Sequence, residues 1–172
     1  LVVVQLTVPL EEARAFAVSA AMLLPLLSWS AMGTREARYN TGQLLFSSPY
    51  PVTRQLPAAL AAGILIALIA MSGMIVRTGL TGQWSYLFAL IIAALFVPSL
   101  ALSLGALTGS KKMFEVSYFL LWYIGSIEKL TPLNFLGTTD EAVAAGIPKV
   151  YLLLTAGLVI SAILTRRRQV VL

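Results

Sequence analysis

Long apolar stretches with almost no charged residue are the feature that most constrains how this chain folds. Five stretches in the 172-residue chain have this character: residues 15–32, 57–76, 86–105, 114–127 and 150–165. A helix needs about 20 apolar residues to cross a bilayer, and a helix satisfies its own backbone polar groups in lipid. The sequence therefore predicts an all-α fold: a polytopic membrane helix bundle of about five transmembrane helices, forming a single domain over residues 1–172. Gly125 and Glu128 cut the fourth stretch short, so a partial or re-entrant element is the alternative there.

The composition leaves little room for a water-soluble domain. Hydrophobic residues make up 59% of the chain and charged residues 11%, whereas soluble domains hold about 25% charged residues. The chain has no Cys and no His. It therefore lacks disulfides and thiolate chemistry, and it lacks the commonest general base and metal ligand.

The distribution of basic residues predicts which side of the membrane each loop faces, because cytoplasmic loops carry an excess of Lys and Arg. If all five stretches cross, one side holds Arg35, Arg38, Arg54, Lys111, Lys112, Arg166, Arg167 and Arg168. The other side holds Arg14, Arg77, Lys129 and Lys149, with Glu11, Glu12, Glu128, Asp140 and Glu141. The chain is thus predicted to lie in the inner (plasma) membrane with its N-terminus outside and its C-terminus in the cytoplasm. The net charge of +5 is then explained by topology rather than by nucleic-acid binding.

The apolar stretches hold almost no ionisable residue; Glu115 stands at the edge of the fourth. Ion-coupled transporters usually place Asp, Glu or His within the membrane, so any transport by this chain is expected to draw its energy from elsewhere. The run from Gly105 to Lys112 fails the spacing of a phosphate-binding loop and predicts a helix end followed by interfacial lysines. Gly105 and Gly109 also form a GxxxG pair, a pattern typical of close helix packing.

The cytoplasmic segment 33–56 carries the most functional information. Its first part mixes charged and apolar residues, and Leu44, Leu45 and Phe46 follow. These residues are expected to form a helix that ends at Pro49, because the residue before proline disfavours the α region. The pattern predicts an amphipathic cytoplasmic helix that lies at the membrane interface or docks into a groove on a partner.

Residues Arg35 to Arg54 resemble the segment that follows the second span in permeases of the ABC-2 type. That family has charged residues there, then a Gly-Thr-x-Glu-x-Leu-Leu-x-Ser-Pro run and a basic residue. The matching residues here are Thr41, Leu44, Leu45, Ser48, Pro49 and Arg54. Asn40 replaces the usual Gly, and Gln43 stands near the usual acidic position.

The resemblance implies a transporter subunit, more specifically an exporter, that lacks an ATPase or catalytic motif of its own. A separate cytoplasmic ABC ATPase would bind ATP, so this chain would carry no cofactor, and a second permease copy would complete the pathway. The residues implied to contact the ATPase are Arg35, Glu36, Arg38, Thr41, Gln43, Leu44, Leu45, Phe46, Ser48, Pro49 and Arg54. Six spans are typical of the family. The start at Leu1 rather than Met suggests a lost first span, and residues 128–149 then fall where the family has an outer, partly re-entrant loop.

Alternatives remain for each of these features. Arg35, Glu36 and Arg38 have the alternative of snorkelling at the interface, and Leu44 to Phe46 that of packing under the headgroups. The aromatic residues Trp84, Tyr86, Trp122 and Tyr123 are expected in interfacial belts, with substrate lining as the alternative for Trp122 and Tyr123. The loop charges Glu128, Lys129, Asp140 and Glu141 are expected to be solvated, with gating of an exit as the alternative. Residues 1–8 fit an outer strand or the end of a lost span.

Two other functions stay open for the whole chain. A non-transporting membrane scaffold or assembly subunit would share the same composition. A membrane-embedded enzyme is disfavoured, because such enzymes usually need His, Asp or a serine-based dyad in the bilayer.

Overall fold

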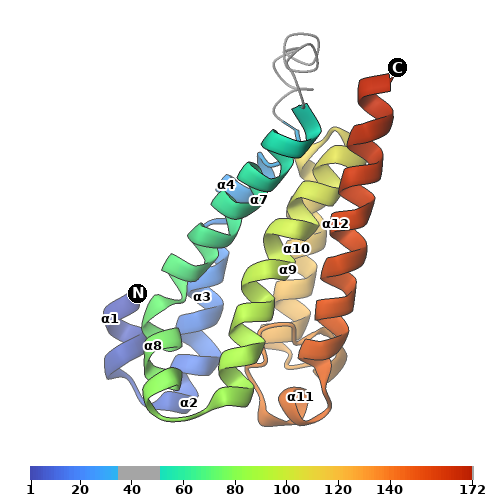
Figure 1. The fold of residues 1–172 in the computed structure, drawn as a ribbon. Helices are drawn as coiled ribbons and strands as arrows, with labels where there is room; N and C mark the ends of the chain where they lie inside the picture. Colours follow the sequence, from blue (N-terminus) through green and yellow to red (C-terminus); the bar gives the residue numbers. More distant parts are fainter. Residues whose placement is uncertain (35–50, 172) are drawn as a thin grey trace.

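The computed structural model describes residues 1–34 and 51–171, and every regular element in these ranges is a helix (Figure 1). The all-α prediction is therefore confirmed for this part of the chain. In chain order the elements are α1 (Val2–Thr7), α2 (Leu10–Glu12), a π-helical turn (Ala13–Ala17), α3 (Val18–Leu23), α4 (Leu26–Ser30), α7 (Pro51–Ala70), α8 (Ser72–Leu80), α9 (Trp84–Thr108), α10 (Lys111–Trp122), a second π-helical turn (Tyr123–Ile127), a 3-10 turn (Thr131–Leu133), α11 (Asp140–Ala144) and α12 (Ile147–Val171).

Helix α9 is the centre of the bundle. It is apolar on all sides, which is typical of a helix that is buried all round. Of its most apolar 18 residues, 72% are buried inside the molecule. Helices α12, α7, α10, α8 and α4 all pack against it. Helix α12 is similarly apolar, yet only 22% of its most apolar 18 residues are buried. Its exposed face, which includes Leu153 and Ile160, is suited to contact with lipid.

Two helices in the described ranges are long and apolar enough to cross a membrane: α9 and residues Ile147–Arg168 of α12. They correspond to the predicted spans 86–105 and 150–165. Helices α7 and α8 make a third if the pair, bent by 65°, counts as one span. These helices support a membrane protein, while the prediction of five spans is not confirmed.

The other two predicted spans are built from shorter helices. Residues 15–32 are divided among the first π-helical turn, α3 and α4. Pro25 precedes α4, and a proline cannot donate the backbone hydrogen bond that would continue α3. The predicted span 114–127 consists of α10, which already begins at Lys111, and the second π-helical turn.

The predicted span 57–76 differs from the structure at both ends. Helix α7 begins at Pro51, so Pro57 lies inside the helix and not in its first turn. Pro51 now stands at the helix start, where a proline is well placed because a backbone N–H would have no partner inside the helix. The helix then breaks at Met71 (φ −100°, ψ 7°) and resumes as α8. Nothing in the sequence indicated this break within the predicted span, which the bent pair still makes if it counts as one.

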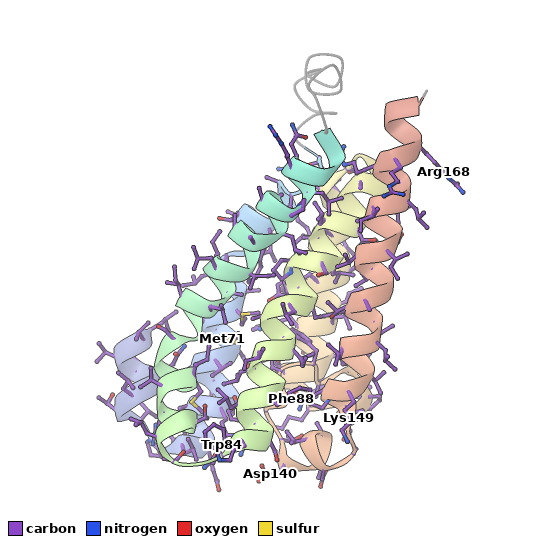
Figure 2. The ribbon with its side chains drawn as sticks, viewed as in Figure 1. Met71, Trp84, Phe88, Asp140, Lys149 and Arg168 are labelled. Atoms are coloured by element: carbon purple, nitrogen blue, oxygen red, sulfur yellow. The ribbon has the colours of Figure 1, made fainter. Side chains whose placement is uncertain are left out.

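The two ends of the bundle carry different residues. The start of α7, the turn between α9 and α10, and the C-terminal end of α12 with Arg168 lie at one end (Figures 1 and 2). Helices α2 and α11 lie at the opposite end, with Trp84, Asp140 and Lys149 (Figure 2). The described basic residues that were predicted to share one side therefore share one end of the molecule.

The turn between α9 and α10 explains the run that faintly resembles a phosphate loop. Gly109 has the left-handed φ of 64° and its N–H bonds back to the Gly105 carbonyl, which ends α9. The Ser110 hydroxyl accepts from the Lys112 N–H at 3.4 Å and caps α10. Of the GxxxG pair, Gly105 is a packing residue and Gly109 is a helix cap.

Candidate functional site

Most residues of the predicted ATPase-contacting segment lie outside the described residues. These are Arg35, Glu36, Arg38, Thr41, Gln43, Leu44, Leu45, Phe46, Ser48 and Pro49. Arg54 is described: it is exposed in the first turns of α7, at the same end of the bundle as Arg168.

The chain enters this segment from a tightly held position. Gly33 has a φ of 74°, and a Cβ added there would lie 2.8 Å from the Leu102 carbonyl oxygen of α9. A Cβ on Gly105 would likewise collide with the Met32 carbonyl oxygen. Arg166 of α12 donates from Nη2 to the Gly33 carbonyl at 3.0 Å. The residues that precede the segment are therefore packed on α9 and hydrogen-bonded to α12.

The chain leaves the segment through α7, which is held in a similar way. A Cβ on Gly63 would lie 2.8 Å from the Pro98 side chain of α9, so the two helices cross closely at this point. Trp29 of α4 donates from its indole Nε1 to the Gly63 carbonyl at 3.1 Å. The helices on both sides of residues 35–50 are thus joined to each other and to α9.

A buried glutamine holds the break between α7 and α8. The Gln5 side-chain amide donates to the Ala70 carbonyl at 2.9 Å, and its oxygen accepts from the Met74 N–H at 3.1 Å. A helix break in an apolar environment leaves such backbone groups without partners. Gly73 makes room for α1, since a Cβ there would lie 2.7 Å from the Val2 carbonyl oxygen. Helix α1 therefore stabilises the bend at Met71 (Figure 2).

Arg77 of α8 also joins α8 to α1. Its Nη1 donates to the carbonyls of Gln5 at 3.1 Å and Val8 at 2.5 Å, which lie in and just beyond α1. A cation at a helix C-terminus is favourable because carbonyls there lack partners. Residues Val2–Thr7 fold as a short helix docked on α8, so the prediction of an outer strand was wrong.

Two aromatic side chains of α10 donate hydrogen bonds to α3, which is part of the predicted span 15–32. The Tyr118 hydroxyl donates to the Met22 carbonyl at 2.7 Å, and the Trp122 Nε1 donates to the Ser19 carbonyl at 2.8 Å. Residues four apart lie on the same helix face, so both reach α3 together. Trp122, which was expected in an interfacial belt, also joins α10 to α3 through this hydrogen bond. Tyr123 and Trp84 are exposed.

The loop over residues 128–149, which was predicted to lie outside (the outer loop), reaches into the aromatic core. Phe135 is fully buried, and its ring lies 5.7 Å from that of Phe96, 6.1 Å from Tyr118 and 6.1 Å from Tyr151. The Tyr151 hydroxyl also donates to the Pro132 carbonyl at 3.3 Å. The segment between the second π-helical turn and α11 therefore folds back into the bundle, as a re-entrant loop would.

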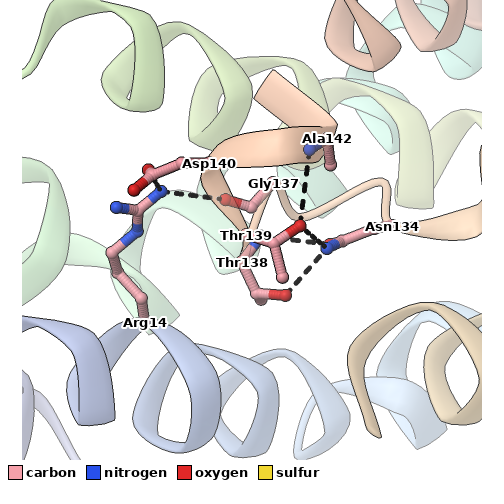
Figure 3. A network of polar contacts seen from close by, with 7 residues as sticks. All are labelled: Arg14, Asn134, Gly137, Thr138, Thr139, Asp140 and Ala142. Carbon is pink, nitrogen blue, oxygen red and sulfur yellow. Dashed lines mark hydrogen bonds and ion pairs between the residues drawn. The ribbon is translucent and has the colours of Figure 1, made fainter. Parts of the chain in front are cut away.

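A network of polar contacts fixes the end of this loop (Figure 3). The side-chain oxygen Oδ1 of the buried Asn134 accepts from the Thr138 N–H at 3.0 Å and from the Thr138 hydroxyl at 3.1 Å. Its amide donates to the Thr139 hydroxyl at 3.1 Å, and that hydroxyl accepts from the Ala142 N–H at 3.4 Å, which caps α11. This network sets the position of Gly137 and Asp140.

Arg14 connects this loop to the first π-helical turn. Its Nη2 lies 2.7 Å from an Asp140 carboxylate oxygen and 3.4 Å from the Gly137 carbonyl oxygen (Figure 3). Its guanidinium carbon lies 4.2 Å from the centre of the Tyr86 ring, a cation–π contact. Asp140 was expected to be a solvated loop charge, and it is exposed but paired. Glu128, Lys129 and Glu141 are exposed.

The sequence missed Gln5, Arg14 and Tyr118 as structural connections. The first two were visible as isolated polar residues within or beside apolar stretches, which is a signal for a buried polar contact. Tyr118 gave no such signal, because an aromatic residue is common in any span. Among the described residues, no group of three or more Asp or Glu side chains is placed to hold a metal ion.

A scan against protein-family models, a search of curated proteins and a search of solved structures each found no match to this chain.

Proposed function

We propose that this chain is the membrane-spanning permease subunit of an ATP-driven transporter of the ABC-2 type, working as an exporter with a separate ATPase. In this proposal it crosses the plasma membrane five times, counting the broken helices as spans. Its N-terminus is outside and its C-terminus is cytoplasmic. A second permease copy completes the pathway. A non-transporting assembly subunit is the alternative.

The observation that carries the proposal is how segment 33–56 is anchored. The segment is the part of the sequence that resembles an ATPase-contacting loop. It joins Gly33, packed against Gly105 of α9, to α7, which crosses α9 at Gly63. A partner that moved this segment would therefore act on α4, α7 and α9 together, because these contacts join all three.

The broken helices support the same mechanism. The first span breaks before α4 at Pro25 and the second breaks at Met71. Discontinuous helices are common in transporters, and hinges at a few residues let one part of a bundle move against another. In the proposed cycle, ATP binding by the partner shifts α4 and the first half of the bent α7–α8 pair. Helix α8 stays attached to α1, and the first π-helical turn stays attached through Arg14 to the loop before α11.

The test is co-purification of the tagged chain with an ABC ATPase from its native membrane, with and without ATP. The variant Leu44→Ala, Leu45→Ala, Arg54→Ala should lose the ATPase. A matched control removes two aliphatic residues and one cation from the opposite end: Ile127→Ala, Lys129→Ala, Leu130→Ala. All three control residues are exposed, and this variant should keep the ATPase.

The outcomes separate the two candidate functions. ATPase retention by the first variant would overturn the coupling role of segment 33–56. ATPase association without ATP-dependent flux in reconstituted vesicles would favour an assembly subunit. Loss of the ATPase only in the first variant, together with ATP-dependent flux, is the result that the permease proposal predicts.

A further inference from the structure

Arg14 is a buried cation whose charged partner is not buried. The Arg14 side chain is 10% exposed, while that of Asp140 is 90% exposed. An uncompensated buried charge is strongly destabilising, whereas an exposed ion pair contributes little. If the two separated, Asp140 would simply be hydrated, but Arg14 would be left without an anion. Arg14 therefore needs a negative group, and Asp140 has little need of Arg14.

One nitrogen of the Arg14 guanidinium lacks a hydrogen-bond partner. Both of its hydrogen-bonded contacts to the loop are made by Nη2. Its Nε is buried with no hydrogen-bond partner in the described ranges, and the Tyr86 ring lies against the guanidinium. Buried donors without partners are rare in native structures, and a functional role is one explanation for them.

We propose that Arg14 forms a binding site for a carboxylate or phosphate group from outside the chain, and that Asp140 is a built-in competitor for this site. Arginine frequently binds both groups through two parallel N–H donors, and Nε with one Nη is one such pair. Asp140 makes only a single contact, through Nη2. An external anion that engages Nε as well would satisfy Arg14 better than Asp140 does.

Binding of such an anion would release the outer loop. Asp140 is the first residue of α11, and its carboxylate and the Gly137 carbonyl both bond Arg14 (Figure 3). An anion that takes Nη2 removes both contacts, while the Asn134 network keeps α11 folded. The π-helical turn that carries Arg14 is an element often found at functional sites. This inference does not depend on the ATPase or on transport.

The experiment uses the absence of cysteine from the natural sequence. Spin labels are attached to Glu11→Cys in α2 and Glu141→Cys in α11, both exposed positions on the two sides of the ion pair. Pulsed electron resonance then measures the distance between the labels in the full chain. The probes are inorganic phosphate in neutral detergent, with sodium chloride at equal ionic strength as the blank, and vesicles of phosphatidylglycerol against phosphatidylcholine.

In the natural background the label distance should increase and saturate with one or both anionic probes. A response to free phosphate alone identifies a soluble anion, and a response to phosphatidylglycerol alone identifies a lipid headgroup. Asp140→Asn removes the competitor at an exposed position, so it should lengthen the distance without any probe. It should also tighten probe binding about fivefold, the value of an exposed ion pair of about 1 kcal/mol. Asp140→Glu should restore the original behaviour.

Glu128→Gln is the matched control, because it removes another exposed carboxylate from the same end; probe affinity should not change. Arg14→Gln should abolish the saturable response, and Arg14→Lys, which keeps the charge but lacks the fork, should weaken it. Two results would overturn the proposal. One is the lack of a saturable response in both the natural background and Asp140→Asn. The other is an unchanged response in Arg14→Gln, since the anion would then bind elsewhere.

Discussion

At the scale of single residues, the bundle depends on a few polar or very small side chains at places where helices meet. Gln5 and Arg77 join α1 to α8, and Arg14 joins the first π-helical turn to the outer loop. Gly105 lets the chain before residue 35 lie directly on α9. The apolar residues between them fill the core or face outward without fixing which helix meets which.

Gln5→Ala should destabilise the protein, because it leaves the Ala70 carbonyl and the Met74 N–H buried without a partner. We expect the free energy of unfolding to fall by about 1–3 kcal/mol, measured by denaturant titration in mixed micelles. Thr7→Ala is the control, since the Thr7 hydroxyl bonds within α1 at an exposed position. Equal effects of the two changes would contradict the role given to Gln5.

Gly105→Ala and Gly157→Ala should have opposite effects. A Cβ on Gly105 would collide with the Met32 backbone, whereas one on Gly157 meets nothing within 4 Å. The first change should cost about 1–3 kcal/mol of stability through overpacking. The second should gain up to about 1 kcal/mol through helix propensity. Thermal unfolding of both variants in detergent checks this, and a stabilised Gly105→Ala would show that the close approach is absent.

At the scale of elements, the sequence predicted helix type well and helix continuity poorly. Helices α9 and α12 follow the predicted spans 86–105 and 150–165, because a long apolar run determines the helix by itself. The break at Met71 lies within the apolar run 57–76, far from its one proline, Pro57. It is held by Gln5, a residue distant in the chain, so hydropathy alone could not reveal it. In the candidate site, the sequence marked Asp140 as a loop charge, but only the fold pairs it with Arg14.

The contact between α10 and α3 gives a test at this scale. Tyr118→Phe removes the hydrogen bond to the Met22 carbonyl and should lower the free energy of unfolding by about 1 kcal/mol or more, since that carbonyl is near a helix break. Tyr123→Phe, which removes an exposed hydroxyl from the adjoining turn, should have almost no effect. The two variants are compared in the same micelle titration. A larger loss for Tyr123→Phe would contradict the assigned contact.

At the scale of the whole molecule, the bundle has one end with most of the described basic residues and an opposite end with the outer loop and the ion pair. The start of α7 with Arg54, the start of α10 with Lys112 and the end of α12 with Arg168 lie at the first end. Helices α2, with Glu12, and α11, with Glu141, lie at the second (Figure 1). The charge pattern predicted this grouping because successive spans alternate in direction. Among the described residues, the predicted spans 15–32 and 57–76 are each divided among shorter helices.

The most direct test of the proposed five crossings is the accessibility of single cysteines placed in the cysteine-free chain. A membrane-impermeant maleimide should label Glu12→Cys, Thr81→Cys and Glu141→Cys from outside intact cells. Arg54→Cys, Lys112→Cys and Arg168→Cys should be labelled only in inverted vesicles. Labelling of residues from both groups from the same side of the membrane would contradict the five crossings and, with them, the proposed position of segment 33–56 in the cytoplasm.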